Sequence, residues 1–344
     1  MPHKHSIFRR QFLAGTATAI GSMALGRPLL ADEDRKRLAA DDKKALIAIT
    51  HDLEMARNFP RWEDTEWDYQ KGNLDAPTKK YARKLCRRVK ARGGVVHCFL
   101  VGQVLEQANV DWLKEIIAEG HPLGNHTYDH QKVNGGYQYR FQRAPWLVQG
   151  KTDREVIVEN IRLCTLAMKQ RLGVEPRGFR TPGGYGNGLA DRTDVQEMLQ
   201  ALGFDWVSSK SPSIPQGEPH QEPSQETYAA VVKSQEESRP FVYPTGLVEV
   251  PFSAPSDITA FRYGRWKLPW FVKAIRLGVE WAIENSATFD LLCHPSSMYV
   301  MDPEFRTADM VCDLVDKAGN RAAIVDLDTI ALRTKLRHGA TGAE

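Results

Sequence analysis

Two histidines four residues apart, His126 and His130, have the spacing best suited to binding a metal ion in this chain. They end the segment 120–130, which reads Gly-His-Pro-Leu-Gly-Asn-His-Thr-Tyr-Asp-His. On a helical turn this spacing directs both imidazoles to the same side, which suits two ligands of one divalent ion. His121 in the same segment is expected only to brace the loop. A third ligand and a catalytic base must therefore come from elsewhere.

Acidic candidates follow a strand-like apolar run at residues 45–50, which continues as His-Asp-Leu-Glu. Asp52 and Glu54 occupy alternate positions, so both would point to one side of an extended chain. One carboxylate can bind the metal while the other accepts a proton from a water that the metal acidifies. His51 would point to the opposite side, as a packing residue.

Arg180 opens the segment Arg-Thr-Pro-Gly-Gly after another strand-like run. An arginine there can hold a carboxylate through two parallel hydrogen bonds and keep it ionised. The glycine-rich turn that follows leaves backbone N–H groups exposed, and these can bind a developing oxyanion. We therefore place Gly183 and Tyr185 among the candidates for substrate binding.

His294 ends the apolar segment Phe-Asp-Leu-Leu-Cys-His. A histidine presented at the end of a strand can act as the general acid that protonates a leaving amine or alkoxide. Four further residues are weaker candidates for the same site at the ends of the strands: Asp205, Trp206, Ser208 and Asp257. We count Asp205 and Trp206 among the substrate-binding candidates.

Strand-like and helical segments alternate along nearly the whole chain and must position these residues. Strands are expected at residues 45–50, 95–101, 122–125, 177–181, 204–208, 247–252, 288–294 and 322–325. Helices are expected at residues 79–91, 110–119, 153–172, 193–202, 270–285 and 303–317. Seven or eight such units predict an α/β fold in a single domain, built as a parallel barrel that is irregular or incompletely closed. The candidate residues would then meet at the carboxyl ends of the strands.

Three connections are too long to be simple turns, at residues 55–78, 133–150 and 210–238. The first contains Trp62 and Trp67, whose rings could stack on sugars or could simply fix the loop in place. The third is rich in Pro, Ser, Gln and Glu, and is expected to be a mobile segment or a lid.

Residues 1–31 have the features of an export signal. Arg9 and Arg10 precede Phe-Leu in the twin-arginine pattern, and a short apolar run follows that is too short to span a membrane. The sequence therefore predicts an exported protein, periplasmic or extracellular, with an ordinary secretory signal or an uncleaved anchor as alternatives. The expected organisation is a leader at 1–31, a linker at 32–43, a catalytic domain at 44–334 and a tail at 335–344.

The charge of the chain gives no reason to expect a nucleic-acid partner. The leader holds four basic residues and no acidic one, which leaves 42 basic against 43 acidic residues in the remainder. That balance lacks the basic excess that nucleic-acid binding favours. The five cysteines are scattered without CxxC spacing, and we expect buried thiols rather than a disulfide framework.

The ordered motifs resemble the polysaccharide deacetylase family, also called carbohydrate esterase family four, from Leu46 to about Ile330. Residues 120–130 match its motif Gly-His-x-x-Gly-Asn-His-Thr-Tyr-x-His. Residues 178–183 are similar to its Arg-Pro-Pro motif, with a threonine in place of the first proline, and residues 291–294 match its final Leu-x-x-His pattern.

This resemblance implies a distorted (β/α)7-type barrel, a zinc ion or a related divalent ion (cobalt, manganese or nickel), and hydrolysis of N- or O-acetyl groups on a carbohydrate. Carried over by position, Asp52 would be the catalytic base and His294 the acid. Arg180 would orient Asp52, and His126 and His130 would bind the metal.

The chain departs from the family pattern in two places. The common Thr-Phe-Asp-Asp-Gly motif has its second aspartate on the metal, and Leu53 stands there in this chain. Branches with Asp-x-Glu would give that role to Glu54. The family's fourth motif, an acid and a tryptophan that support the arginine and the last histidine, has its best candidate in Asp205 and Trp206.

Two alternative functions remain at this point. The Asp-x-Glu pattern and the proline after His294 are also similar to relatives that hydrolyse non-acetyl amides and cyclic ureides. A carbohydrate-binding protein without catalysis is the other alternative. The identity of the metal, the choice of glycan and the oligomeric state are not specified by these motifs.

Overall fold

The computed structural model describes residues 43–55, 71–133 and 149–341. The predicted leader and nearly all of the predicted linker lie outside these ranges, as do Trp62 and Trp67. The predictions made for them therefore stay predictions.

A curled sheet forms the centre of the protein, and strand β1 (Ala45–Leu53) lies within it. The sheet order is β6-β7-β5-β4-β3-β2-β1-β8, and β9 also pairs with β1. All pairs are parallel except β6 with β7. The other strands are β2 (Val96–Leu100), β3 (Leu123–Asn125), β4 (Gly178–Tyr185), β5 (Trp206–Lys210), β6 (Phe241–Val242), β7 (Val248–Glu249), β8 (Thr288–Cys293) and β9 (Ala322–Ile324). All nine residues of β1 are buried, as expected of a parallel strand covered on both faces.

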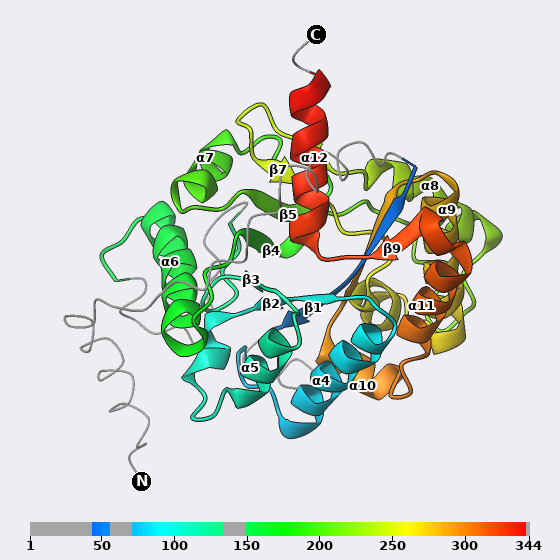
Figure 1. The fold of residues 1–344 in the computed structure, drawn as a ribbon, viewed down its shortest axis with the longest axis horizontal. Helices are drawn as coiled ribbons and strands as arrows, with labels where there is room; N and C mark the ends of the chain where they lie inside the picture. The colour runs from blue at the N-terminus through cyan, green and yellow to red at the C-terminus, as the bar shows by residue number, and fades with distance from the viewer. Residues whose placement is uncertain (1–42, 56–70, 134–148, 342–344) are drawn as a thin grey trace.

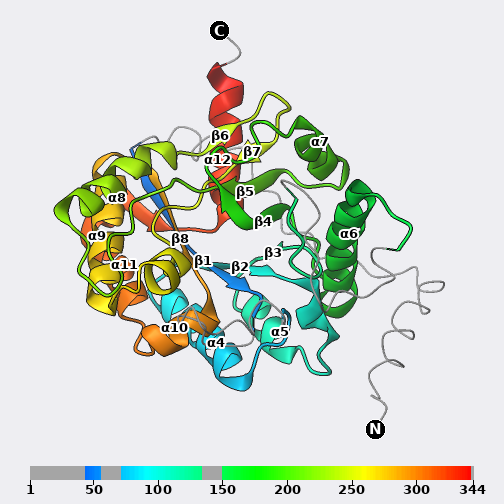
Figure 2. The same ribbon diagram turned by 180° about the vertical axis from the view of Figure 1, so that it is seen from behind.

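Helices surround this sheet on the outside, as Figures 1 and 2 show. Helices α6 and α7 lie at one side, and α8, α9 and α11 lie at the other. They are α4 (Ala76–Ala91), α5 (Asp111–Ala118), α6 (Asp153–Leu172), α7 (Thr193–Ala201), α8 (Gln225–Glu237), α9 (Leu268–Glu284), α10 (Pro295–Met301), α11 (Arg306–Ala318) and α12 (Leu327–Thr341), with short helical turns η1 (Gly102–Glu106), η3 (Ile258–Tyr263) and η4 (Gly319–Arg321). No helix in the described ranges is both long enough and apolar enough to cross a membrane.

The two edges of the sheet approach each other through an irregular segment after β7. The N–H of Val250 still bonds to Val207 of β5 at 2.8 Å, whereas the N–H of Ser253 bonds to the carbonyl of Asp290 in β8 at 3.0 Å. Phe99 and Trp206 fill the interior together with Leu327 of α12. The protein is therefore a single α/β domain with the distorted barrel that the alternating segments predicted.

Most predicted elements are confirmed, and α6 illustrates why. Its predicted bounds match the observed ones because Thr152 and Glu155 form a capping box at its start and Gly173 ends it in the left-handed conformation. Two predictions differ from the structure. Helix α8 lies inside the expected loop at 210–238, where buried Tyr228 and Val231 anchor its polar sequence. Helix α12, which no predicted helix covered, spans residues 327–341. The domain bounds stay predictions.

Candidate metal and catalytic site

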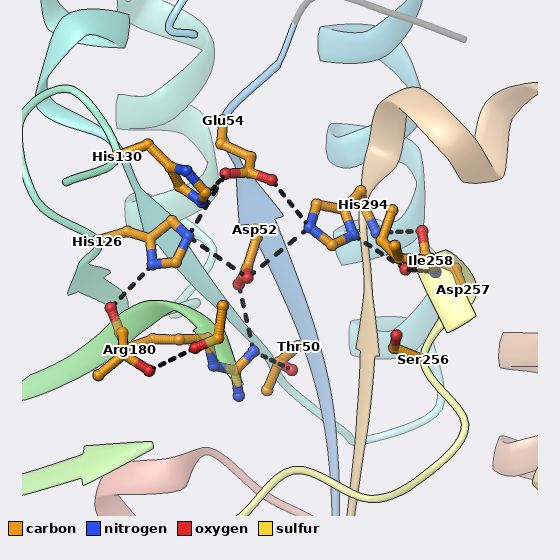
Figure 3. A network of polar contacts seen from close by, with 12 residues as sticks. Thr50, Asp52, Glu54, His126, His130, Arg180, Ser256, Asp257, Ile258 and His294 are labelled. Carbon is orange, nitrogen blue, oxygen red and sulfur yellow. Dashed lines mark hydrogen bonds and ion pairs between the residues drawn. The ribbon is translucent and has the colours of Figure 1, made fainter. Parts of the chain in front are cut away.

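The end of β1 presents two carboxylates to one side of the sheet, as the alternation predicted. Asp52 and Glu54 are 4% and 3% exposed. Figure 3 shows both side chains facing His126 and His294. His51 points elsewhere and stacks on Tyr81 with ring centroids 6.2 Å apart. Burial lowers the pKa of His51 to about 3, so this ring is a neutral packing residue.

The turn that carries His126 and His130 is not helical, so the rings do not owe their common direction to the i, i+4 spacing of a helix. Thr127 and His130 adopt left-handed backbone angles, with φ of 62° and 65°. This conformation is unfavourable for residues other than glycine and persists where surrounding contacts enforce it. The two rings nevertheless converge, with centroids 4.9 Å apart.

Two buried asparagines supply the contacts that hold this turn. Asn125 at the end of β3 accepts a hydrogen bond from the N–H of Thr127 at 2.8 Å. Asn160 of α6 accepts bonds from the N–H groups of Tyr128 and Asp129, each at 3.1 Å. These side chains replace the bonds that a helix would have supplied, and therefore fix where the imidazoles point.

Glu54, His126 and His130 form a compact donor set whose ligand atoms all lie within 4.8 Å of one another. The Oε2 atom of Glu54 lies 2.5 Å from His130 Nε2 and 3.6 Å from His126 Nε2. The other nitrogen of His126, Nδ1, is 2.9 Å from the carbonyl oxygen of Arg180, which fixes the ring. One carboxylate oxygen and two imidazole nitrogens are the donor types of zinc and related divalent ions. The 2.5 Å contact between Glu54 and His130 is a hydrogen-bond distance, so these two atoms must move apart when both bind one ion.

The protonation states of these groups also suit a metal. Burial lowers the pKa of His130 well below its usual value, which leaves the lone pair of the ring nitrogen available. Burial opposes the charge of Glu54, but the ammonium group of Lys71 and hydrogen bonds from the His126 and His130 rings hold the pKa of this carboxyl well below its ordinary value. Metal binding requires a neutral imidazole and an ionised carboxylate, so the residues present fit the ion.

Arg180 lies fully buried between two carboxylates. Its guanidinium is 3.2 Å from Asp52 Oδ1 and 2.5 Å from Asp290 Oδ2. It also donates to the hydroxyls of Thr50 and Ser208 at 2.8 and 3.2 Å. Oδ1 of Asp52 is thereby occupied, while Oδ2 lies 3.6 Å from His126 Nε2 and 3.9 Å from His294 Nε2. The predicted contact between Arg180 and Asp52 is therefore present, while the role of Arg180 in orienting Asp52 stays a prediction.

His294 follows β8 and faces the same cluster. Its Nδ1 lies 2.9 Å from Asp257 Oδ1, and its backbone N–H donates to the other oxygen of Asp257 at 2.8 Å. Its Nε2 is 3.1 Å from Glu54 Oε1. Burial alone would lower the pKa of His294, but the charges and hydrogen bonds of Asp257 and Glu54 outweigh it and raise the pKa to about 10. This imidazole can therefore hold a proton at neutral pH.

Asp205 and Trp206 do not lie at this site, and their assignment to substrate binding and to the fourth motif is wrong. They lie at the amino end of β5, where Asp205 forms an ion pair with Arg177. Trp206 is 1% exposed and donates its indole N–H to Asp328 at 2.9 Å. The acids that support the arginine and the last histidine are instead Asp290 and Asp257.

The glycine-rich segment after Arg180 was expected to be a turn, but it lies within β4, whose pairing with β5 shifts register between Arg180 and Tyr185. Gly183 and Gly184 are exposed there. Gly183 has φ of 83°, and a side chain there would approach the aliphatic chain of Lys132, two residues beyond His130. Tyr185 is half-buried and donates its hydroxyl to the carbonyl of Pro182 at 3.2 Å. His121 accepts a hydrogen bond from the N–H of Val96 at 2.9 Å and is a bracing residue.

Residues 71–207 match the sequence model of the polysaccharide deacetylase family. The resemblance that the motifs predicted is thereby confirmed. No curated protein matches the chain significantly.

Solved structures share the fold at low sequence identity. A protein described as a polysaccharide deacetylase from Mycobacterium smegmatis has a TM-score of 0.57 and 15% identity, over 87% of this chain and 93% of that one. A second, from Pseudomonas aeruginosa PAO1, has a TM-score of 0.58 and 12% identity, over 85% and 91%. Puue Allantoinase has a TM-score of 0.56 and 14% identity, over 92% and 97%. These similarities establish the barrel fold.

Replacing Arg180 by Met tests its role in the buried charge cluster. The change leaves Asp52 and Asp290 without their shared cation, and we expect it to destabilise the protein by about 3–5 kcal/mol. Arg177→Met is the matched control, because its ion pair with Asp205 joins side chains that are 65% and 36% exposed. That pair is expected to contribute less than about 1 kcal/mol. If urea unfolding gave Arg180→Met and Arg177→Met the same loss in free energy of unfolding, the proposed difference between the buried and exposed ion pairs would be wrong.

The raised pKa of His294 predicts how the stability of the metal-free protein depends on pH. Because folding raises its pKa from 6.5 to about 10, its stabilising contribution is complete below pH 6.5 and is lost as the pH rises toward 10. An NMR titration should show one imidazole, absent in His294→Gln, that stays protonated above pH 8. Asp257→Asn should lower this pKa. A His294 ring that loses its proton below pH 7 would contradict the assignment.

Proposed function

We propose that this chain, which carries polysaccharide deacetylase sequence over residues 71–207, is a metal-dependent hydrolase that removes N- or O-linked acetyl groups from a carbohydrate. One observation carries the proposal. A complete donor set, Glu54, His126 and His130, lies between two groups able to move protons, Asp52 and His294. The family resemblance supplies the acetylated carbohydrate as the substrate class.

Asp52 is the residue that takes a proton from the attacking water. Glu54, His126 and His130 would hold a divalent ion, which when bound would supply Lewis-acid chemistry to the acyl oxygen and to a nearby water. Arg180 contacts Oδ1 of Asp52 at 3.2 Å and orients the carboxylate, so Oδ2 is left to act as the base.

His294 is the residue that protonates the leaving amine or alkoxide. Its Nε2 faces the cluster, and Asp257 holds Nδ1 at 2.9 Å, which fixes the ring and stabilises its protonated form. We also assign to the backbone N–H groups near Gly183 the stabilisation of the developing oxyanion, and to Tyr185 a contact with the substrate.

Metal removal tests this mechanism. Protein stripped with a chelator should lose activity and regain it with zinc or cobalt. His126→Ala should lose metal and reduce kcat/KM by roughly a hundredfold or more. His220→Ala replaces an exposed histidine and should leave both quantities unchanged. Full activity in stripped protein would contradict a metal mechanism.

A second function, hydrolysis of an amide or cyclic ureide, is favoured by the structural similarity to Puue Allantoinase over 92% of this chain. The same donor set and proton-transfer groups suit that reaction. Release of acetate from acetylated glycans supports the first proposal, whereas ring-opened product without acetate supports the second. Glycan binding without turnover for any metal would instead indicate a carbohydrate-binding protein.

Export is part of the proposal and is supported by the twin-arginine pattern at Arg9 and Arg10. That route carries folded proteins, so the metal could be acquired before export.

A further inference from the structure

A lysine shares the carboxylate oxygen on which the proposed metal site depends. Lys71 Nζ lies 2.8 Å from Glu54 Oε2, and the two side chains are each 3% exposed. That same oxygen lies 2.5 Å from His130 Nε2. The ammonium group and the donor set therefore converge on one atom.

The backbone around Lys71 is built to keep it there. The N–H of Gly72 donates to the carbonyl of Glu54 at 2.7 Å, and the carbonyl of Gly72 accepts from Gln107 at 3.0 Å. Gly72 has φ of 86°, and a Cβ there would lie 2.4 Å from Cβ of Gln103. Only glycine fits this close approach, so the segment is fixed against η1 and holds Lys71 beside Glu54.

Resting on the metal site of the proposed function, we infer that Lys71 is a positioning residue that occupies Glu54 in the metal-free protein and weakens metal binding. A buried carboxylate needs a positive partner, and the ammonium group provides one. A divalent ion bound to the same oxygen brings two cations close together in a buried site, where their repulsion is strong.

Two effects of opposite sign follow from removing the charge at Lys71. The metal-free protein loses the cation that stabilises Glu54, so it should become less stable. The metal loses a competitor for the same oxygen, so it should bind more tightly. A lysine that only packed against its neighbours would reduce stability without tightening metal binding.

The test measures zinc affinity by competition with a chelator, using the full mature chain stripped of metal. Lys71→Met should bind zinc at least about tenfold more tightly than the wild type, because one positive charge is removed near the ion. Lys71→Arg keeps the charge and should stay within about threefold. Lys132→Met removes a lysine that lies near Gly183 and should have a much smaller effect than Lys71→Met.

Thermal unfolding of the metal-free proteins gives the second measurement. Lys71→Met should unfold at a lower temperature than the wild type, and added zinc should raise its melting temperature by more than it raises that of the wild type. Lys71→Gln provides the same comparison if the methionine variant does not fold.

The outcomes separate this inference from the proposed function. Wild-type protein that binds no zinc would overturn the metal site itself. Wild-type protein that binds zinc, with Lys71→Met binding equally or more weakly, would overturn only the role of Lys71.

Discussion

Four buried carboxylates meet near the carboxyl ends of β1 and β8, and the rest of the site depends on how their charges are matched. A buried carboxylate without a partner is strongly destabilising, so each needs a cation or a hydrogen-bonded donor. Arg180 lies between Asp52 and Asp290, and His294 is held by Asp257. Glu54 contacts His130 and Lys71. It is the carboxylate of this group whose oxygen also faces both imidazoles of the donor set.

The barrel brings these groups together because parallel strands end on one face. β1 places Asp52 beside its neighbour β2, while β8 and the segment after it bring Asp290 and His294 to the other side. Side chains from outside the strands complete the arrangement: α6 fixes the histidine turn through Asn160, and the segment before α4 carries Lys71. The fold thus brings charged side chains from distant positions in the sequence into one buried site, where they interact strongly.

Much of the fold and half of the site follow from local patterns. Period-two alternation predicted the shared direction of Asp52 and Glu54, and strand ends predicted Arg180 and His294. Asp290 also left a signal, because an aspartate within an otherwise apolar strand needs a buried partner. No pattern in the sequence indicates the left-handed turn at His130 or the position of Lys71 beside Glu54, since both depend on tertiary contacts. Choosing Asp205 and Trp206 by residue type alone failed, because they lie at the amino end of β5.

We propose that Glu54, rather than Asp52, completes the metal site with the two histidines. A crystal structure of the zinc-loaded protein, with anomalous diffraction locating the ion, tests this directly. We expect one ion bound by Glu54, His126 and His130, with Asp52 still paired to Arg180 and directed toward the space beside the ion. An ion bound by Asp52, with Glu54 turned away, would contradict it.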